Sequence, residues 1–173
     1  LFYEPFCGFV ATGHRLSSRR RISTVELAAD EMILKDSGHC LHDQVSQRCS
    51  GSAAQRAESS TRLQFAGGSL ESLIRIVESG HGVTLLPELA TRDLSDSSRR
   101  LLRALDPPIP ARQVSLITYG EGIKTRLLEV LRQSILAAVP QDLMHKKDTW
   151  RIIDAKTAWK SRPEAGEDFL KAV

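Results

Sequence analysis

Two closely spaced cysteines are the residues in this sequence best suited to chemistry. Cys40 and Cys49 lie nine positions apart in the polar segment DSGHCLHDQVSQRCSG, residues 36–51, and the chain has only three cysteines. The residues before this segment predict a strand and DSG predicts a turn, so a helix is expected to begin next to Cys40. A thiol in the first turn of a helix faces the positive end of the helix dipole and free backbone N–H groups, which lower its pKa.

The side chains around Cys40 also bear on its reactivity. His39 and His42 flank the thiol, and each would favour the thiolate when protonated. Asp43 follows three residues after the cysteine and could cap the start of the helix, although its charge opposes a thiolate. On balance the segment predicts a reactive thiol.

The spacing of the two cysteines has a geometric consequence. On an intact helix, nine residues span about 13 Å along the axis, and Cys49 would point away from Cys40. A disulfide needs Cα atoms within about 7 Å of each other. The two thiols can therefore bond only if the segment unwinds, which predicts one fold for the dithiol and another for the disulfide. Such a disulfide closes a small loop, and its strain would make it easy to reduce.

Other interpretations of the cysteines remain open at this point. Two nearby cysteines in a helix are often inert core thiols. His39, Cys40, His42 and Cys49 could together bind a metal, although they lack the paired CxxC spacing of structural zinc sites. Cys7, in PFCGFV, is expected to be a buried strand thiol without a role.

Composition places the chain among ordinary globular proteins. Its 173 residues are 41% apolar and 26% charged, enough for one domain or two small lobes. A net charge of +3 does not by itself indicate nucleic-acid binding. The basic runs are predicted to be solvated surface rather than a phosphate-binding stripe; they lie at 19–21, 99–100 and 146–147.

Neither a signal peptide nor a membrane span is recognisable in the sequence. Three cysteines do not make a secreted disulfide scaffold, so a reducing, cytoplasmic compartment is expected. The chain opens on a strand-like run at Leu1 instead of a methionine, which suggests the middle of a longer protein.

Short apolar runs alternate with amphipathic segments along the chain. Strands are predicted at 6–11, 31–35, 61–65, 82–86 and 113–119. Because helical patterns lie between them, we expect a parallel sheet in an α/β fold. Three prolines in ALDPPIPAR predict a stiff connector, which could cross between lobes.

Three helices have clear sequence signals. Ser23 and Glu26 have the spacing of a capping box, and Ser69 is the expected cap of a helix that stops at Gly80. A longer helix ends at Pro140 and places one apolar stripe along its length: Leu127, Leu128, Leu131, Ile135 and Val139. The tail after Pro140 has no clean period.

With these elements placed, GHCLHDQVSQRC followed by GGSLESLIRIVESGHGVTLLPELA closely resembles the effector-binding domain of the OxyR family, the hydrogen-peroxide sensors among LysR-type transcriptional regulators. The resemblance covers residues 1–140. It implies a periplasmic-binding-protein-like, Rossmann-like α/β fold with two lobes. Residues 1–112 would form the second lobe, with a redox switch segment at 36–51, and residues 113–140 would return a strand and a helix to the first lobe.

The resemblance also implies what this chain lacks. The other half of the first lobe and a winged helix-turn-helix that binds DNA would precede Leu1, so the helix at 127–139 would expose apolar surface. Residues 141–173 would be a tail of unknown role. The helix at 69–79 would contribute to a subunit interface, although it also has the pattern of a core helix.

Residue by residue, the resemblance makes Cys40 the peroxidatic cysteine and Cys49 the resolving one. His39, Asp43 and Arg112 match residues that support the peroxide site. His42 departs from the family pattern, in which arginine is common at this position. A histidine is only partly protonated at neutral pH, which changes the local charge.

The function implied is regulatory. Peroxide would oxidise Cys40, a reversible Cys40–Cys49 disulfide would form, and antioxidant genes would respond. Expected partners are hydrogen peroxide, further copies in a homodimer or homotetramer, promoter DNA through the missing domain, RNA polymerase, and a thiol reductant such as glutaredoxin or thioredoxin. No cofactor, metal or membrane is expected, and the protein is expected to be a stoichiometric sensor and not an enzyme.

Two other functions compete with this interpretation. A LysR-type domain could bind a small metabolite between its lobes without thiol chemistry, and the helix start at residues 67–69 would suit an anion there. Alternatively, the chain could be a thiol peroxidase, which would consume peroxide continuously with a reductant.

Overall fold

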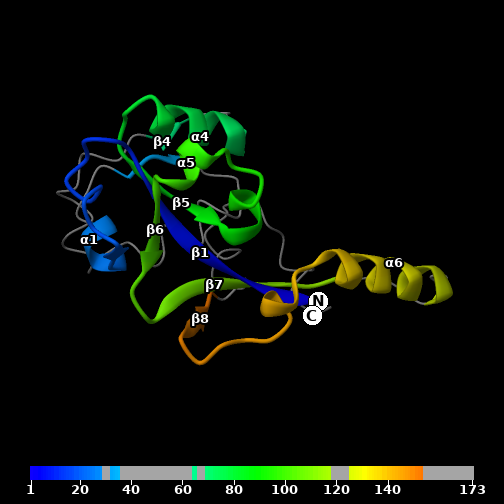
Figure 1. Ribbon diagram of the computed structural model, residues 1–173. Coiled ribbons are helices and arrows are strands. Elements are labelled where there is room, and N and C mark those ends of the chain that lie inside the picture. Colours follow the sequence, from blue (N-terminus) through cyan, green and yellow to red (C-terminus); the bar gives the residue numbers. More distant parts are fainter. Residues whose placement is uncertain (29–31, 36–63, 66–68, 118–124, 154–173) are drawn as a thin grey trace, which may run out of the picture.

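The structure, a computed structural model, describes residues 1–28, 32–35, 64–65, 69–117 and 125–153 (Figure 1). The elements in these ranges are, in chain order, β1 Phe2–Val10, β2 Arg21–Ile22, α1 Thr24–Ala28, β3 Leu34–Lys35, β4 Gln64–Phe65, α4 Leu70–Glu78, β5 Val83–Pro87, η1 Glu88–Thr91, α5 Asp96–Arg99, β6 Leu102–Leu105, β7 Ile109–Val114, α6 Thr125–Ala138, η2 Gln141–Leu143 and β8 Trp150–Ile152. Figure 1 shows the strands gathered in one body, from which α6 projects as an arm.

Strand β1 is the centre of the main sheet. It pairs with β5, β6 and β7, and all three pairs are antiparallel. The β2–β6, β3–β4 and β7–β8 pairs are parallel. The α/β class is therefore right, but the expected parallel sheet is wrong at its centre. The reason is that β6 and β7 follow each other without a helix between them, and both run back along β1.

The side chains of β1 alternate between two buried clusters. Phe6 and Val10 belong to one cluster, whereas Phe9, and Ala11 directly after the strand, belong to the other. Gly8 lies on the same face as Phe6, as expected from the two-residue period of a strand. A Cβ atom at Gly8 would lie 2.5 Å from Cδ1 of Ile22, so a larger residue at this position of β1 would force the Ile22 side chain to shift.

The predicted strands are found with one clear shift. The run at 82–86 is β5, the run at 6–11 is the later part of β1, and β3 and β4 lie inside the two runs between them. The strand predicted at 113–119 is instead β7, which begins at Ile109. The prolines explain the error. Pro107 and Pro108 form the turn between β6 and β7, but Pro110 lies within β7 and does not continue a connector.

Both predicted helix starts are confirmed. In α1, the Glu26 N–H donates to Ser23 Oγ at 3.1 Å, and the Ser23 N–H donates to Glu26 Oε2 at 2.9 Å, which completes a capping box. In α4, the Ser72 N–H donates to Ser69 Oγ at 3.3 Å. Gly80 follows the end of α4 with a φ of 99°, a conformation that favours glycine.

Helix α6 is exposed along most of its length. Leu127, Val130 and Leu131 are 63%, 53% and 45% exposed, which confirms the apolar surface expected on this helix. Ile135 and Val139, at the other end, pack against a third buried cluster that includes Trp150. None of the helices in the described ranges has the length and apolar character of a membrane span.

The first part of the tail belongs to the folded core. Strand β8 pairs with β7 in parallel, with Ala111 opposite Ile152. Leu143 is fully buried, and Trp150 is 6% exposed. No hydrophobic period is visible in this part of the sequence because η2 and β8 are three residues each and are separated by a turn. Residues from 154 onward lie outside the described ranges.

Candidate functional site

Two short strands flank the predicted switch. Strand β3 ends at Lys35, and β4 begins at Gln64. The two strands pair in parallel, with Leu34 opposite Gln64 and Lys35 opposite Phe65. The chain therefore enters and leaves residues 36–63 from a pair of adjacent strands. His39, Cys40, His42, Asp43 and Cys49 themselves lie outside the described residues.

The strand that leads to Cys40 is anchored to the core. Met32 forms a parallel bridge to Val83, and the Ile33 N–H donates to the Val83 carbonyl at 2.9 Å. Thr84 Oγ1 donates to the Ile33 carbonyl at 2.8 Å. Met32, Ile33 and Thr84 are all buried. This anchoring confirms the core of the predicted strand at 31–35 and gives the segment a rigid point of departure.

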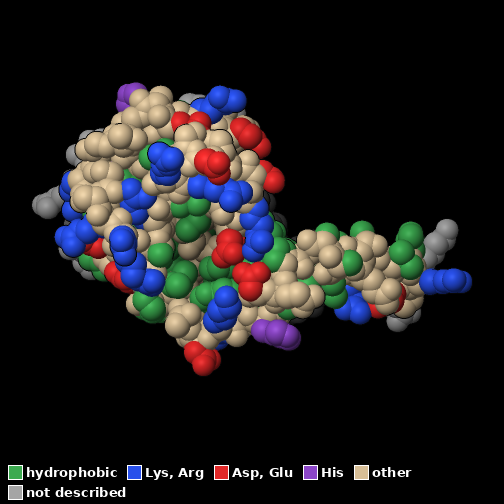
Figure 2. Space-filling view, in the orientation of Figure 1, with side chains coloured by type: hydrophobic (Ala, Val, Ile, Leu, Met, Phe, Trp, Pro, Cys, Tyr) green, Lys and Arg blue, Asp and Glu red, His purple; other side chains and the backbone are tan. Residues whose placement is uncertain are grey.

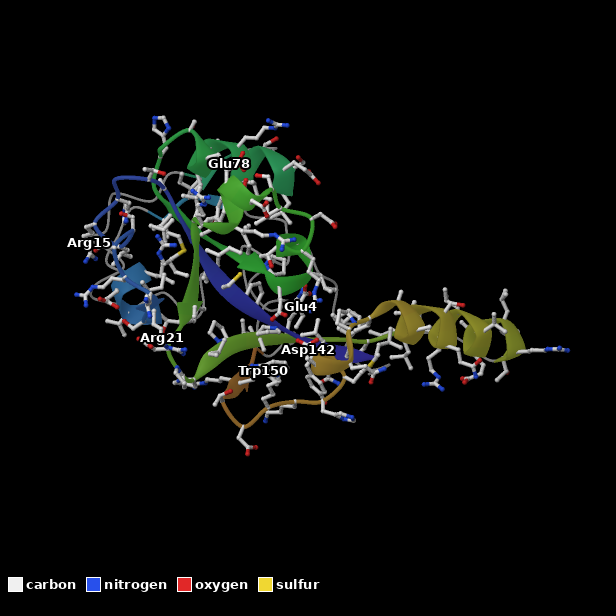
Figure 3. The ribbon with its side chains drawn as sticks, in the orientation of Figure 1. Glu4, Arg15, Arg21, Glu78, Asp142 and Trp150 are labelled. Atoms are coloured by element: carbon white, nitrogen blue, oxygen red, sulfur yellow. The ribbon has the colours of Figure 1, made fainter. Side chains whose placement is uncertain are left out.

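Arg112 is the member of the predicted peroxide site that the described ranges include. It lies on β7 directly opposite Glu4 of β1. Its Nε donates to Glu4 Oε2 at 2.7 Å, and its Nη2 lies 2.7 Å from the same oxygen in an ion pair. The other carboxylate oxygen of Glu4, Oε1, accepts the Leu89 N–H at 2.9 Å. Figure 3 shows Glu4 inside the body where β1 approaches β7.

The Glu4–Arg112 pair is asymmetric in its burial. The side chain of Glu4 is 1% exposed, whereas that of Arg112 is 27% exposed. A buried carboxylate is stable as an anion only where partners replace its lost water, and here Arg112 and the Leu89 N–H do so. The pair thus fixes the Arg112 guanidinium between the sheet and solvent. Glu4 was not among the predicted site residues, although a lone carboxylate in the apolar run FYEPFCGFV is a signal that could have identified it.

Cys7 lies on a strand, β1, as expected, but it is partly and not fully buried. It donates through Sγ to the Leu86 carbonyl at 3.4 Å. Burial, followed by the negative charges of Glu88 and Glu4, raises the pKa of the Cys7 thiol to about 12. Cys7 is thus a protonated, weakly nucleophilic thiol at neutral pH.

A pocket of about 380 Å³ lies beside η1 and α5 and is lined by Glu88, Thr91, Arg92, Arg99 and Leu102. Its two guanidinium groups already have partners within the protein. Arg92 pairs with Glu88 at 3.2 Å and Asp142 at 3.4 Å, and Arg99 Nε donates to the Leu94 carbonyl at 2.9 Å. Arg92 is therefore paired with two carboxylates, whereas Arg99 is bound to backbone carbonyls and keeps its positive charge in the pocket.

Metal binding finds no support in the described part of the chain. No group of three or more His, Cys, Asp or Glu side chains suited to a metal ion occurs there. The candidate set around Cys40 lies outside those residues and stays a prediction.

The central β1, flanked by antiparallel strands with helices packed outside them, defines an effector domain of the α/β, periplasmic-binding-protein-like class. Residues 1–140 match the LysR substrate binding domain, and the chain belongs to this family, which serves transcriptional regulators and not a class of enzymes. The matched range is the same as the range of the resemblance in the sequence.

Two curated relatives are regulators of gene expression, and one of them is named for hydrogen peroxide. A probable hydrogen peroxide-inducible genes activator of Mycobacterium leprae is 36% identical over 116 residues, which cover 67% of this chain and 36% of that protein. The DNA-binding transcriptional dual regulator OxyR of Escherichia coli is 29% identical over 138 residues, which cover 79% of this chain and 43% of that protein. The chain thus spans less than half the length of these relatives.

Solved structures agree with the sequence comparison. Reduced OxyR from Porphyromonas gingivalis is 32% identical, with a TM-score of 0.75, and the match covers 88% of this chain and 67% of that one. The oxidized form of OxyR is 26% identical, with a TM-score of 0.60, and the match covers 79% of this chain and 62% of that one. The described fold is therefore that of OxyR regulatory domains.

Proposed function

We propose that this chain is the peroxide-sensing part of a LysR-type transcription activator, and that it works through a reversible disulfide between Cys40 and Cys49. The observation that carries the proposal is the pair of cysteines in GHCLHDQVSQRC, in a LysR-family chain similar to hydrogen peroxide-inducible activators. His39 and Asp43 support the peroxide site from the switch segment, and Arg112 supports it from β7.

The proposed chemistry is a two-electron oxidation of the protein by one peroxide. The Cys40 thiolate attacks one peroxide oxygen, the O–O bond breaks, and one proton is taken up as water leaves, so that Cys40 becomes a sulfenic acid. The Cys49 thiol then attacks the Cys40 sulfur and displaces a second water. A dithiol reductant such as glutaredoxin or thioredoxin returns both cysteines to thiols.

Three features of the described residues support this mechanism. The segment before Cys40 is hydrogen-bonded to β5 through Ile33, so residues 36–63 would refold from one anchored end. The Arg112 guanidinium is held by Glu4 and has solvent-exposed surface with which to stabilise an anion. The pKa of the Cys7 thiol is raised far above that of a reactive thiol, so Cys7 does not compete for peroxide.

The proposed output is a change in subunit arrangement. Residues 1–112 would form the second lobe and 113–140 the return to the first lobe, with β1 and β7 as the two connecting strands. Refolding of the switch would alter a homodimer or homotetramer interface that includes α4, and with it the spacing of DNA-binding domains on a promoter and their contact with RNA polymerase. The protein would act once per oxidation in the cytoplasm, as a sensor and not an enzyme, and control antioxidant genes.

Thiol-alkylation mass spectrometry tests the proposal. A brief micromolar peroxide pulse should protect Cys40 first and produce a Cys40–Cys49 disulfide, while Cys7 is unchanged. The variant Cys49→Ser should stop at the sulfenic acid, which dimedone would trap. Equal inertness of Cys40 and Cys49 in the folded protein would overturn the proposal.

The two rival functions predict different outcomes when the same purified proteins are tested. A metabolite that raises the melting temperature equally in the native chain and in Cys40→Ser would indicate an ordinary LysR-type effector domain. Sustained peroxide consumption in the presence of a thiol reductant would indicate a peroxidase.

A further inference from the structure

Two arginine runs that are far apart in the sequence form one surface. Strand β2 begins at Arg21 and pairs with β6, where Arg21 lies opposite Ala104. Arg103 on β6 reaches across to the loop before β2, and its Nη2 donates to the Ser17 carbonyl. Its Nη1 donates to the Arg100 carbonyl at 2.6 Å. Arg103 therefore ties the two segments, residues 12–22 and 97–105, to each other.

We call this surface the arginine face and define it by Arg19, Arg20, Arg21, Arg100 and Arg103. Figure 2 shows basic side chains spread over the part of the body that carries β2 and β6. Neither segment contains an aspartate or a glutamate. The side chains of the first four arginines are exposed, whereas Arg103 is half-buried in its clamping position.

Carboxylates border the arginine face and offset part of its charge; one of them is Asp96 in α5, four residues before Arg100, which is the C-cap of that helix. Asp106 pairs with Arg21 at 3.0 Å, and both side chains are about half exposed. Hydrogen bonds from Ser23, and then the charges of Arg19 and Arg15, lower the pKa of Glu26, so Glu26 is ionised at neutral pH. Arg20 and Arg100 make no hydrogen bond or ion pair through their guanidinium groups with the part of the chain that the structure describes. The face therefore keeps an excess of positive charge with guanidinium groups free to bind.

We propose that the arginine face binds the phosphate backbone of double-stranded DNA without sequence preference. This inference rests on the proposed function, which brings the chain close to promoter DNA. Guanidinium groups fit phosphate oxygens in pairs, and every cation of the face is an arginine.

The composition of the face favours DNA over a protein partner. Protein interfaces usually have an apolar core with aromatic anchors. Of the described residues, the exposed large apolar side chains are Val25, Leu116, Ile117, Leu127, Val130 and Leu131, and none lies in the two segments of the face. The contacts available are electrostatic, as in non-specific DNA binding.

Fluorescence anisotropy with a labelled duplex of about 30 base pairs and arbitrary sequence tests the inference on this chain, across roughly 20 to 200 mM salt. The native chain should bind with a Kd of about 10⁻⁴ to 10⁻⁶ M near physiological salt, and more tightly as the salt concentration is lowered. The triple variant Arg19→Glu, Arg20→Glu, Arg100→Glu should bind at least about tenfold more weakly. Because each phosphate contact contributes about 0.9 to the log–log salt slope, its slope should be shallower by about 2 to 3.

A matched control distinguishes an effect of the arginine face from an effect of the lower net charge. Arg126→Glu, Lys146→Glu and Arg151→Glu change three exposed cations outside the face, and Arg151 lies on β8 at the opposite edge of the sheet. This control should lose less than about threefold in affinity. Circular dichroism should show both triple variants folded.

Three results would overturn the inference. They are no binding by the native chain at low salt, an equal loss in the two triple variants, and tighter binding to a polyglutamate peptide than to the duplex, which would indicate an acidic protein partner. The proposed function fails separately, because formation of the Cys40–Cys49 disulfide is measured without DNA.

Discussion

Glu4 and Arg112 face each other across β1 and β7 and are joined by two contacts of 2.7 Å, with the carboxylate buried and the guanidinium partly open to water. The pair connects two strands that lie 108 positions apart in the sequence, at the point where β1 also approaches η1 through the Leu89 N–H. It therefore combines a structural role in the sheet with the proposed role of Arg112 in binding an anion.

The unequal burial of this pair predicts unequal costs of mutation. Arg112→Met leaves a buried carboxylate without its cation and should lower the free energy of unfolding by about 3 to 5 kcal/mol. Glu4→Gln leaves a guanidinium that water can still reach, so its cost should be smaller. Urea denaturation of both variants and of the double variant gives the coupling energy.

The double variant is the control for this comparison. Glu4→Gln with Arg112→Met removes both charges and should recover part of the stability lost in Arg112→Met. Equal costs for the two single variants, or a coupling energy near zero, would contradict the asymmetric pair.

A second prediction concerns the contribution of the segment after α6 to stability. Trp150 is 6% exposed and packs in the third cluster on the outer side of β7. Trp150→Ala should cost about 3 to 5 kcal/mol, the usual range for truncating a buried aromatic side chain. Arg151→Ala, at the exposed neighbouring position of β8, should stay within about 0.5 kcal/mol. Thermal and urea unfolding of the two variants would show whether β8 is part of the cooperative core; similar small effects would show that it is not.

Gly8 predicts a steric effect that a second substitution can relieve. Gly8→Ala places a Cβ atom 2.5 Å from Ile22 Cδ1, and Ile22 is fully buried. Such overpacking should cost about 1 to 3 kcal/mol. Ile22→Val removes the clashing Cδ1, so the double variant should be more stable than the sum of the two single effects. Additive effects in urea denaturation would mean that the cost at Gly8 comes from the backbone instead.

Helix ends could be predicted because their signals lie in neighbouring residues, whereas the arrangement of the sheet could not, because it depends on which strands pair. The capping box of Ser23 and Glu26, the cap at Ser69 and the stop at Gly80 each depend on neighbouring residues, and all are found in the structure. The antiparallel centre of the sheet depends on which strands meet β1, and periodicity along one strand carries no such information.

The candidate site shows the same division. Arg112 was predicted through a family motif, but its partner Glu4 comes from a strand more than a hundred residues away. The short strand at Trp150 escaped prediction because three residues give no period, and it forms against β7, which is itself placed by tertiary contacts. The cysteine pair was predicted from its chemistry, and its geometry remains a prediction.

Cys7 predicts a pH effect with a defined sign. The pKa of its thiol is raised to about 12 in the folded protein, whereas an unfolded cysteine has an ordinary pKa of about 8.5. Above the unfolded value the unfolded chain releases this proton and the folded chain keeps it, so the contribution of Cys7 to stability is complete below about pH 8.5 and is lost as pH rises toward 12. The loss should be at most about 1.4 kcal/mol per pH unit in this window.

Comparison with Cys7→Ala isolates this effect from the titration of lysines and tyrosines. The difference in the free energy of unfolding between the native chain and the variant should be constant from about pH 6 to 8 and should shift in favour of the variant above about pH 9. Iodoacetamide should label Cys7 slowly at neutral pH and rapidly after denaturation. A parallel pH dependence in the two proteins, or rapid labelling of Cys7 in the native state, would mean that Cys7 is not the protected thiol that the proposed peroxide chemistry requires.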